Sequence, residues 1–109
     1  MSVPEQGLNV DGKAIQFDKD GFMVDPALWD AVVAAAIAGD EGIEQMTDKH
    51  WGIVNFIRDY WKKNDLAPPV RLICTELGVN VREIYRLFKS GPARGACRIA
   101  GLPKPDGCV

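Results

Sequence analysis

Cysteine is scarce in this chain, and so are long apolar runs. Three cysteines in 109 residues are too few for the disulfide framework of a small secreted domain. The longest apolar run, residues 31–38, is far shorter than the roughly 20 residues of a membrane span. The first residues also lack the basic start and apolar stretch of a secretory signal peptide. We therefore expect a cytoplasmic protein whose thiols stay reduced.

Motifs for metal and nucleotide binding are missing as well. A zinc site takes about four ligands, whereas the single histidine, His50, lies far along the chain from Cys97 and Cys108. There is no CxxC pair, and neither phosphate-binding glycine pattern, GxxxxGKS/T or GxGxxG, occurs. These absences argue against zinc chemistry, thioredoxin-like chemistry and nucleotide binding. We expect no metal ion and no cofactor.

Charge is distributed unevenly, although the net charge is only −2. Residues 1–79 contain seven Lys/Arg against thirteen Asp/Glu, a balance of −6, and residues 80–109 contain six against two, a balance of +4. A basic end on an acidic body suggests an anionic substrate or partner for that end. Chance clustering on a solvated face would give the same counts, so charge alone leaves both interpretations open.

The composition, 47 % hydrophobic and 26 % charged, is that of one ordinary globular domain. A β-hairpin is predicted within residues 8–17, because Asp11-Gly12 suits a type I′ turn. A second turn at Asp20-Gly21 allows a short third strand at residues 22–24. Apolar periodicity beyond it makes the domain mainly α-helical. The expected helices cover residues 26–39, 47–64, 69–77, 81–89 and 93–100.

Capping residues give the boundaries of the first two helices. Asp25 can cap the first helix, Pro26 suits its first position, and Gly39 suits its end. Thr47 caps the second helix, and His50 is expected in its first turn, partly solvated. The stripe expected to face the core from the first helix consists of Leu28, Trp29, Val32, Val33, Ala36 and Ile37.

Residues 69–77 and 81–89, joined by a glycine-containing turn, resemble a helix-turn-helix. A DNA-binding regulator with a thiol redox switch is therefore one alternative, in which the second helix contacts DNA. A helix pair that only packs in the core fits the same pattern. The acidic chain also lacks the basic balance typical of DNA-binding domains, so nucleic acid is not the expected partner. The residues assigned to DNA contact in this alternative are Arg82, Arg86 and Lys89.

The three cysteines occupy different settings. Cys74 lies in an apolar stretch and is expected to be a small buried hydrophobe. Ten residues separate Cys97 from Cys108, which is the penultimate residue. Residues 101–109 contain two prolines and no helical periodicity, which predicts an extended arm that can carry Cys108 about 23–25 Å from Gly101. Such a thiol can enter a cleft in a partner or fold back onto Cys97.

Positive charge near these thiols would favour the thiolate, which is the nucleophile. The cations nearest in sequence are Arg94, Arg98 and Lys104, and we assign them to thiol activation or partner docking. A disordered tail with two unused thiols fits the same spacing. The residues alone therefore leave the role of the arm open.

The C-terminus resembles the end of the DsrC/TusE family, the gamma-subunit-like proteins of dissimilatory sulfite reductase and their sulfur-relay relatives. The resemblance is carried by GPAR, ACRIAGLPKP and GCV, at residues 91–94, 96–105 and 107–109. It extends over nearly the whole chain from about Leu8. The upstream segments that resemble the family are residues 10–13, 20–22, 47–61, 69–71 and 85–88, with Trp29.

The resemblance implies a mainly helical domain with an N-terminal hairpin, a helix-turn-helix-like portion and a mobile C-terminal arm, without metal or organic cofactor. The chain then divides into a disordered N-terminus (1–7), a helical domain (8–100) and the arm (101–109). It also implies a sulfur carrier or co-substrate rather than a stand-alone enzyme. In such proteins the penultimate cysteine, here Cys108, reaches the partner's active site, and the upstream one, here Cys97, joins it in a disulfide or trisulfide.

The presence of both cysteines favours the two-cysteine branch linked to sulfite reductase. Relatives that act in tRNA thiolation typically keep only the penultimate cysteine, and such a TusE-like relay is the alternative within the family. The implied partners are dissimilatory sulfite reductase or another sulfur-relay complex, and sulfurtransferase donor proteins. A membrane-bound thiol/disulfide reductase complex is a further candidate. A scaffold subunit whose tail only docks is the third class of function.

Overall fold

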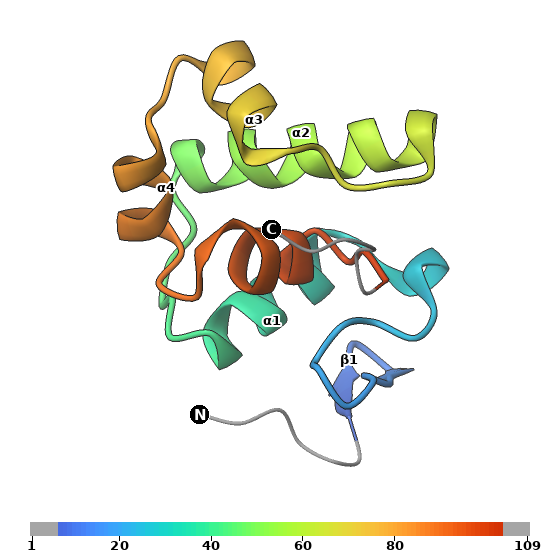
Figure 1. The fold of residues 1–109 in the computed structure, drawn as a ribbon. Coiled ribbons are helices and arrows are strands. Elements are labelled where there is room, and N and C mark those ends of the chain that lie inside the picture. The colour runs from blue at the N-terminus through green and yellow to red at the C-terminus, as the bar shows by residue number, and fades with distance from the viewer. Residues whose placement is uncertain (1–6, 104–109) are drawn as a thin grey trace.

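The computed structural model describes residues 7–103, and this part of the protein is mainly helical, as expected (Figure 1). The predictions made for residues 1–6 and 104–109 lie outside it. None of the described helices is long and apolar enough to cross a lipid bilayer. In chain order the elements are β1 (Leu8–Val10), β2 (Lys13–Ile15), the 3₁₀ turn η1 (Pro26–Leu28), α1 (Ala31–Asp40), α2 (Asp48–Asn64), α3 (Val70–Leu77), α4 (Val81–Leu87) and the π-helix η2 (Pro92–Cys97).

The N-terminal hairpin is confirmed. β1 and β2 pair antiparallel, and both turn residues, Asp11 (φ 53°) and Gly12 (φ 83°), are left-handed, as a type I′ turn requires. The predicted third strand at residues 22–24 is wrong, because only an isolated bridge joins Phe17 to Met23. The Asp18 carboxylate accepts the backbone N–H groups of residues 20 and 22 and so stabilises the turn between the two bridged residues.

The single helix predicted over residues 26–39 is two elements. Asp25 caps only the short η1, and the chain is extended at Trp29 (ψ 139°). Asp30 then caps α1 by accepting the N–H of Val33 at 2.9 Å. Two aspartates five residues apart both suit the cap, and the second one starts the longer helix.

The later start of α1 also changes which of its residues face the core. Val33, Ala34, Ile37 and Ala38 are buried, whereas Val32, placed in the apolar stripe by the sequence, is 53 % exposed. Gly39 does not end the helix either. The left-handed residue that stops it is Gly42 (φ 88°), in a turn where the N–H of residue 43 bonds to the carbonyl of Ala38.

α2 begins where the sequence placed it, at a Thr47 cap. His50 completes the cap, because its Nδ1 accepts the Thr47 N–H at 3.0 Å. Its Nε2 therefore carries the proton and donates to the carbonyl of Leu87 at 3.0 Å. The ring packs edge-on against Phe88 and is only 7 % exposed, so the expectation that His50 is partly solvated is wrong.

The C-terminal helix η2 lies between α1 and α2, near the middle of the molecule (Figure 1). It packs on α2, the longest helix. Its buried residues join side chains from the hairpin and every long helix in one apolar core. The segment that precedes the terminal arm is therefore part of the core of the fold.

Candidate functional site

Cys97 is the last residue of η2, and 4 % of it is exposed. The sequence predicted a helix over residues 93–100, and the structure starts one residue earlier, at Pro92, with wider π-type turns that become α-helical at Arg98. Gly95 lets this helix approach α4, because a Cβ there would lie 3.0 Å from the Cβ of Phe88. Close packing thus places Cys97 inside the fold.

The helix ends in a Schellman motif that turns the chain back beside Cys97. The N–H of Leu102 donates to the Cys97 carbonyl at 3.3 Å, and the N–H of Gly101 donates to the Arg98 carbonyl at 3.0 Å. Gly101 takes the left-handed conformation (φ 75°) that this turn requires. The C-terminal segment therefore starts directly next to Cys97.

Two side chains from elsewhere in the chain hold this turn. The indole Nε1 of Trp29 donates to the Ile99 carbonyl at 2.8 Å. Nη1 of Arg58, on α2, donates to the Ala100 carbonyl at 2.9 Å and contacts that of Gly101 at 3.5 Å. The Arg58 guanidinium carbon lies 4.4 Å from the centre of the Trp29 ring, and burial lowers the pKa of this guanidinium.

These contacts move the inner boundary of the predicted arm. Gly101 and Leu102, which the sequence placed in the arm, are buried in the fold. An arm that carries Cys108 would begin beyond Leu102. From Pro103 the thiol-bearing residue is five residues away, which corresponds to a reach of roughly 17–18 Å. Cys108 and Lys104 themselves lie outside the described residues.

Arg98 points into the protein. Its guanidinium bonds to the Asp40 carboxylate at 2.8 Å, to the Glu41 carboxylate, and through Nε to the carbonyl of Gly21. The arginine is 2 % exposed, and its guanidinium lies 5.3 Å from the ring of Phe17. Partner docking would need an exposed guanidinium, so the geometry gives Arg98 a structural role, in tying η2 to α1.

Arg94 is the exposed cation of η2. Its side chain is 65 % exposed and pairs loosely with Asp20, at 3.7 Å. Of the three cations predicted to activate thiols or dock a partner, Arg94 is the one that the described structure presents to solvent. Its assignment to docking stays a prediction.

Cys74 lies on α3 and is half-buried against the core, less enclosed than the sequence suggested. The helix pair formed by α3 and α4 is present, with Gly78 left-handed (φ 66°) at the turn. The residues predicted for DNA contact, Arg82, Arg86 and Lys89, are all exposed. Glu83 interrupts this basic row, where its carboxylate pairs with Lys49 of α2 and lies 3.8 Å from Arg86.

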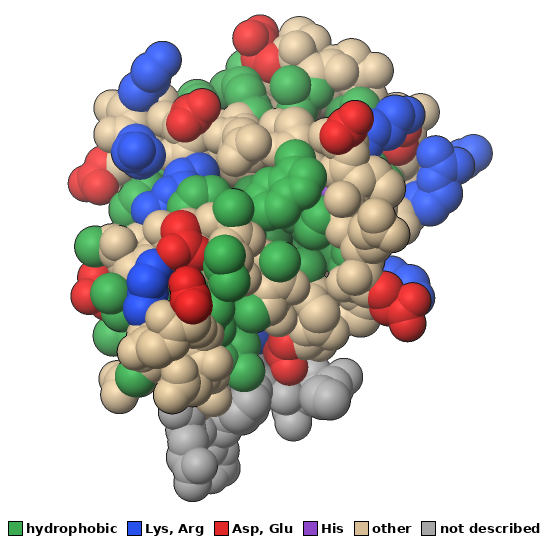
Figure 2. Space-filling model, turned by 180° about the vertical axis from the view of Figure 1, so that it is seen from behind, with side chains coloured by type: hydrophobic (Ala, Val, Ile, Leu, Met, Phe, Trp, Pro, Cys, Tyr) green, Lys and Arg blue, Asp and Glu red, His purple; other side chains and the backbone are tan. Residues whose placement is uncertain are grey.

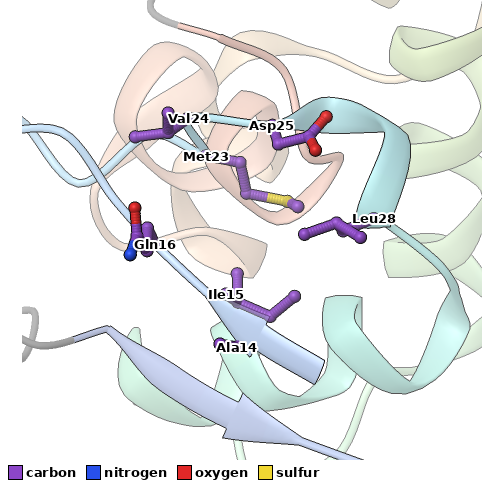
Figure 3. Close-up of a pocket in the computed structure, with 7 residues that line it drawn as sticks. All are labelled: Ala14, Ile15, Gln16, Met23, Val24, Asp25 and Leu28. Atoms are coloured by element: carbon purple, nitrogen blue, oxygen red, sulfur yellow. The ribbon is translucent and has the colours of Figure 1, made fainter. Parts of the chain in front are cut away.

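Within residues 7–103 no cluster of three His, Cys, Asp or Glu side chains is arranged to hold a metal ion. A cavity of about 160 Å³ lies between the hairpin and η1 (Figure 3). The side chains of Ile15, Met23 and Leu28 line it, and Asp25 at its rim bonds to the N–H of Ala27 as the cap of η1. This arrangement provides no reactive group.

Figure 2 shows hydrophobic side chains in the middle of the rear face, with Lys and Arg mostly at its margins. Within residues 7–103 the large exposed hydrophobic residues lie on α1, on α4 and between elements. They are Val24, Val32, Leu66, Val81 and Tyr85.

The sequence did not single out the roles of Trp29 and Arg58. Trp29 was placed in an apolar stripe, and Arg58 was noted only within a family-like segment. A signal for Arg58 exists, because it lies four residues after Val54 and three before Trp61, on the apolar face of α2. An arginine in such a position needs hydrogen-bond acceptors, and here they are two backbone carbonyls, that of Ala100 after η2 and that of Pro26 in η1.

The fold and this site define a class: a small helical domain whose last helix ends in a buried cysteine and leads into a terminal segment with a second one. A family model described as "DsrC like protein" matches residues 9–109. The chain belongs to the DsrC family.

Relatives in this family carry two kinds of name. The gamma subunit of dissimilatory-type sulfite reductase from Nitratidesulfovibrio vulgaris is 43 % identical over 98 residues, which cover 90 % of this chain and 93 % of that protein. Sulfurtransferase TusE of Escherichia coli K12 is 36 % identical over 106 residues, covering 91 % and 96 %. Sequence similarity thus connects the chain to both groups.

Solved structures agree with this relationship. The oxidised gamma subunit of dissimilatory sulfite reductase (DsrC) from Archaeoglobus fulgidus superposes with a TM-score of 0.84 and 46 % identity, covering 94 % of this chain and 98 % of that one. The DsrC/gamma subunit from Pyrobaculum aerophilum gives a TM-score of 0.85, also at 46 % identity, and both chains are covered completely. The fold predicted from the resemblance is confirmed.

Proposed function

We propose that this protein is a cytosolic sulfur carrier and co-substrate of dissimilatory sulfur metabolism, with Cys108 as the sulfur-accepting residue and Cys97 as the resolving thiol. The observation that carries the proposal is the Schellman turn, which starts the C-terminal segment beside Cys97. A reach of roughly 17–18 Å beyond Pro103 lets Cys108 either contact a partner or return to Cys97. The names of the relatives support the same class of function.

Loading is a thiol exchange at sulfur. The Cys108 thiolate attacks the outer sulfur of a donor persulfide, a Cys108–sulfur bond forms, and the donor's own sulfur–sulfur bond breaks. The products are a persulfide on Cys108 and the donor thiolate. No net oxidation or reduction occurs, because the sulfane sulfur only passes from the donor's sulfur atom to that of Cys108.

Release uses the second cysteine. The Cys97 thiolate attacks the Sγ of the Cys108 persulfide, the outer sulfur leaves as hydrosulfide, and a disulfide joins the two residues. The transferred sulfur is reduced, and the two protein thiols are oxidised. Reduction of this disulfide by a thiol/disulfide reductase closes the cycle, and a membrane-bound complex of that kind is a fitting partner.

The partners follow from the same chemistry. Persulfide-forming sulfurtransferases would load Cys108, and dissimilatory sulfite reductase or another sulfur-relay complex would take the terminal segment into its active site. Arg94 and Lys104 would assist docking of anionic sulfur species or of the partner. A TusE-like relay for tRNA thiolation is the second candidate, favoured by the names of relatives such as the E. coli protein.

The experiment is a loading and release assay with glutathione persulfide. The reduced wild-type protein should release sulfide and end as the Cys97–Cys108 disulfide. Cys97→Ser should keep an adduct of about 32 Da, one sulfur atom, and release little sulfide. Cys108→Ser should take up no stable adduct, and full loading of Cys108→Ser would contradict the assignment. Replacing both cysteines without loss of partner activity would favour a scaffold subunit instead.

A further inference from the structure

We propose that Trp29 and Arg58 form a clamp that fixes the direction in which the C-terminal segment leaves the fold, and so determines how readily Cys108 closes onto Cys97. The clamp consists of these two side chains and the three carbonyls that they hold, those of residues 99–101. The inference depends on the proposed function only in its choice of the two cysteines.

The clamp satisfies backbone groups that a helix end leaves without partners. The last carbonyls of a helix have no N–H donor within the helix. At this end the Ile99 carbonyl accepts from Trp29 at 2.8 Å and the Ala100 carbonyl from Arg58 at 2.9 Å. The second bond is charge-assisted and so stronger than one between neutral groups. Successive carbonyls are thus held from two different parts of the chain.

The same side chains leave space only for glycine at the turn. A Cβ on Gly101 would lie 2.2 Å from Cδ1 of Trp29 and 2.9 Å from Nη1 of Arg58. The indole therefore lies directly on the backbone of Gly101, whose φ of 75° also favours glycine. Beyond this glycine the N–H of Leu102 bonds to the carbonyl of Cys97, so the chain leaves the turn beside Cys97.

The clamp is itself well anchored. Arg58 projects from α2, and its guanidinium lies 4.4 Å from the ring of Trp29 and 5.5 Å from that of Trp61. Its Nη2 donates to the Pro26 carbonyl at 2.9 Å, which connects it to η1. Since Nη1 and Nη2 bond to two different segments, these contacts restrain the orientation of the guanidinium. The point at which the terminal segment leaves the fold is therefore held by contacts to α2 and, through Arg58, to η1.

This arrangement has a consequence for thiol chemistry. The effective concentration of one tethered group at another depends on the length and stiffness of the tether. The clamp holds the backbone as far as the turn, so only the chain beyond Leu102 remains to bring Cys108 to Cys97. Loss of the clamp's hydrogen bonds would free the end of the helix as well. The flexible part of the chain between the two cysteines would then be longer, and formation of the Cys97–Cys108 disulfide would be less favourable. The disulfide should then be easier to reduce.

The test is a glutathione redox titration of the Cys97–Cys108 disulfide in a Cys74→Ser background. The reaction consumes two glutathione thiols and yields the dithiol and glutathione disulfide. The key variant is Arg58→Met, which keeps most of the apolar stem, and Arg58→Lys keeps the charge but not the fork of donors. Trp29→Phe, which removes the indole N–H donor and reduces the bicyclic ring to a single aromatic ring, is the second route if Arg58→Met fails to fold.

A matched control separates the effect of losing the clamp from the effect of a lower free energy of unfolding. Ile73→Val truncates a buried residue of α3 and lowers the free energy of unfolding without touching the clamp. We expect Arg58→Met to lower the equilibrium constant for disulfide closure about tenfold, which is about 30 mV for a two-electron couple. Arg58→Lys should lie between it and the wild type, and Ile73→Val should match the wild type.

The proposed clamp is overturned if the equilibrium constant for disulfide closure is the same in the wild type, Arg58→Met and Trp29→Phe. It is also overturned if the wild-type protein forms no Cys97–Cys108 disulfide. Persulfide loading of Cys97→Ser tests the proposed function separately. If that variant does not load while Arg58→Met still shifts the equilibrium, the carrier function fails and the clamp stands. If it loads while no variant shifts the equilibrium, the clamp fails alone.

Discussion

The indole nitrogen of Trp29 donates a 2.8 Å hydrogen bond to the carbonyl of Ile99, seventy residues further along the chain. This bond connects the break between η1 and α1 with the end of η2. In one continuous helix from Pro26, Trp29 would be a helical residue, and its side chain would not be placed to bond to the carbonyl of Ile99. The extended chain between η1 and α1 therefore helps to hold the end of the last helix.

Gly101→Ala should destabilise the fold more than Gly78→Ala. Both glycines are left-handed, with φ of 75° and 66°, so both alanine variants lose about 1–2 kcal/mol of free energy of unfolding to backbone strain. Nothing lies within 4 Å of a Cβ on Gly78, whereas one on Gly101 would overlap Trp29. Urea unfolding should show a further loss of about 1–3 kcal/mol for Gly101→Ala. Equal losses would show that the indole moves aside freely.

Arg98→Met should be among the most destabilising substitutions in the protein. It leaves the buried carboxylates of Asp40 and Glu41 without their cation, and breaking a buried pair costs about 3–5 kcal/mol. Arg94→Met is the matched control, because the Arg94 side chain is 65 % exposed and lies 3.7 Å from Asp20, so this pair should contribute no more than about 1 kcal/mol. Thermal and urea unfolding would measure both. A small loss for Arg98→Met would contradict the structural role.

Stability should fall on acidification, partly through Asp30. The hydrogen bond from the Lys13 ammonium, helped by the backbone N–H of Val33, holds the pKa of Asp30 below its usual 3.8. A carboxylate whose pKa is lower when folded stabilises the fold above the unfolded pKa, and this contribution is lost as pH falls through the folded pKa. The loss due to Asp30 should therefore come at pH below 3.8.

Asp30→Asn provides the measurement, because asparagine also caps a helix but carries no charge. Its free energy of unfolding, compared with that of the wild type between neutral and acidic pH, should show the smaller decrease. An identical pH profile for the two proteins would show that the Lys13–Asp30 pair contributes nothing to stability.

Duplex DNA should bind weakly, if at all. Glu83 places a carboxylate within the basic row of α4, where it already pairs with Lys49 and would repel phosphates. Titration of labelled duplex at several salt concentrations would measure this. Strong binding that weakens with salt, and that Arg82→Ala and Arg86→Ala reduce, would instead support the helix-turn-helix regulator.

Much of the fold follows from local signals in the sequence. The Asp11-Gly12 turn, the Thr47 cap and Gly78 each require a specific backbone conformation, and each lies where expected. The errors occur where two local signals compete. Asp25 and Asp30 both suit a helix cap, and Gly39 and Gly42 both suit a helix end. In the structure Asp25 caps only the short η1, whereas Asp30 starts α1 and Gly42 is the left-handed residue that follows it.

The candidate site was only partly predictable. Spacing and family resemblance identified Cys97 and Cys108, because such features are local in sequence. The clamp was not found, because the contact between Trp29 and Ile99 depends on how distant segments pack. For the same reason Arg98 was assigned to thiol activation or partner docking, although it is buried and pairs with two carboxylates at the end of α1.

The central claim is that sulfur is carried on Cys108, and peptide mapping after persulfide loading tests it most directly. After alkylation without reductant, trypsin separates the three thiols, since Cys97 falls in residues 95–98, Cys74 in residues 72–82 and Cys108 in residues 99–109, where Lys104-Pro105 resists cleavage. In Cys97→Ser, the additional sulfur of about 32 Da should be confined to the peptide of residues 99–109. Sulfur found on Cys74, or an unmodified terminal peptide, would contradict the account.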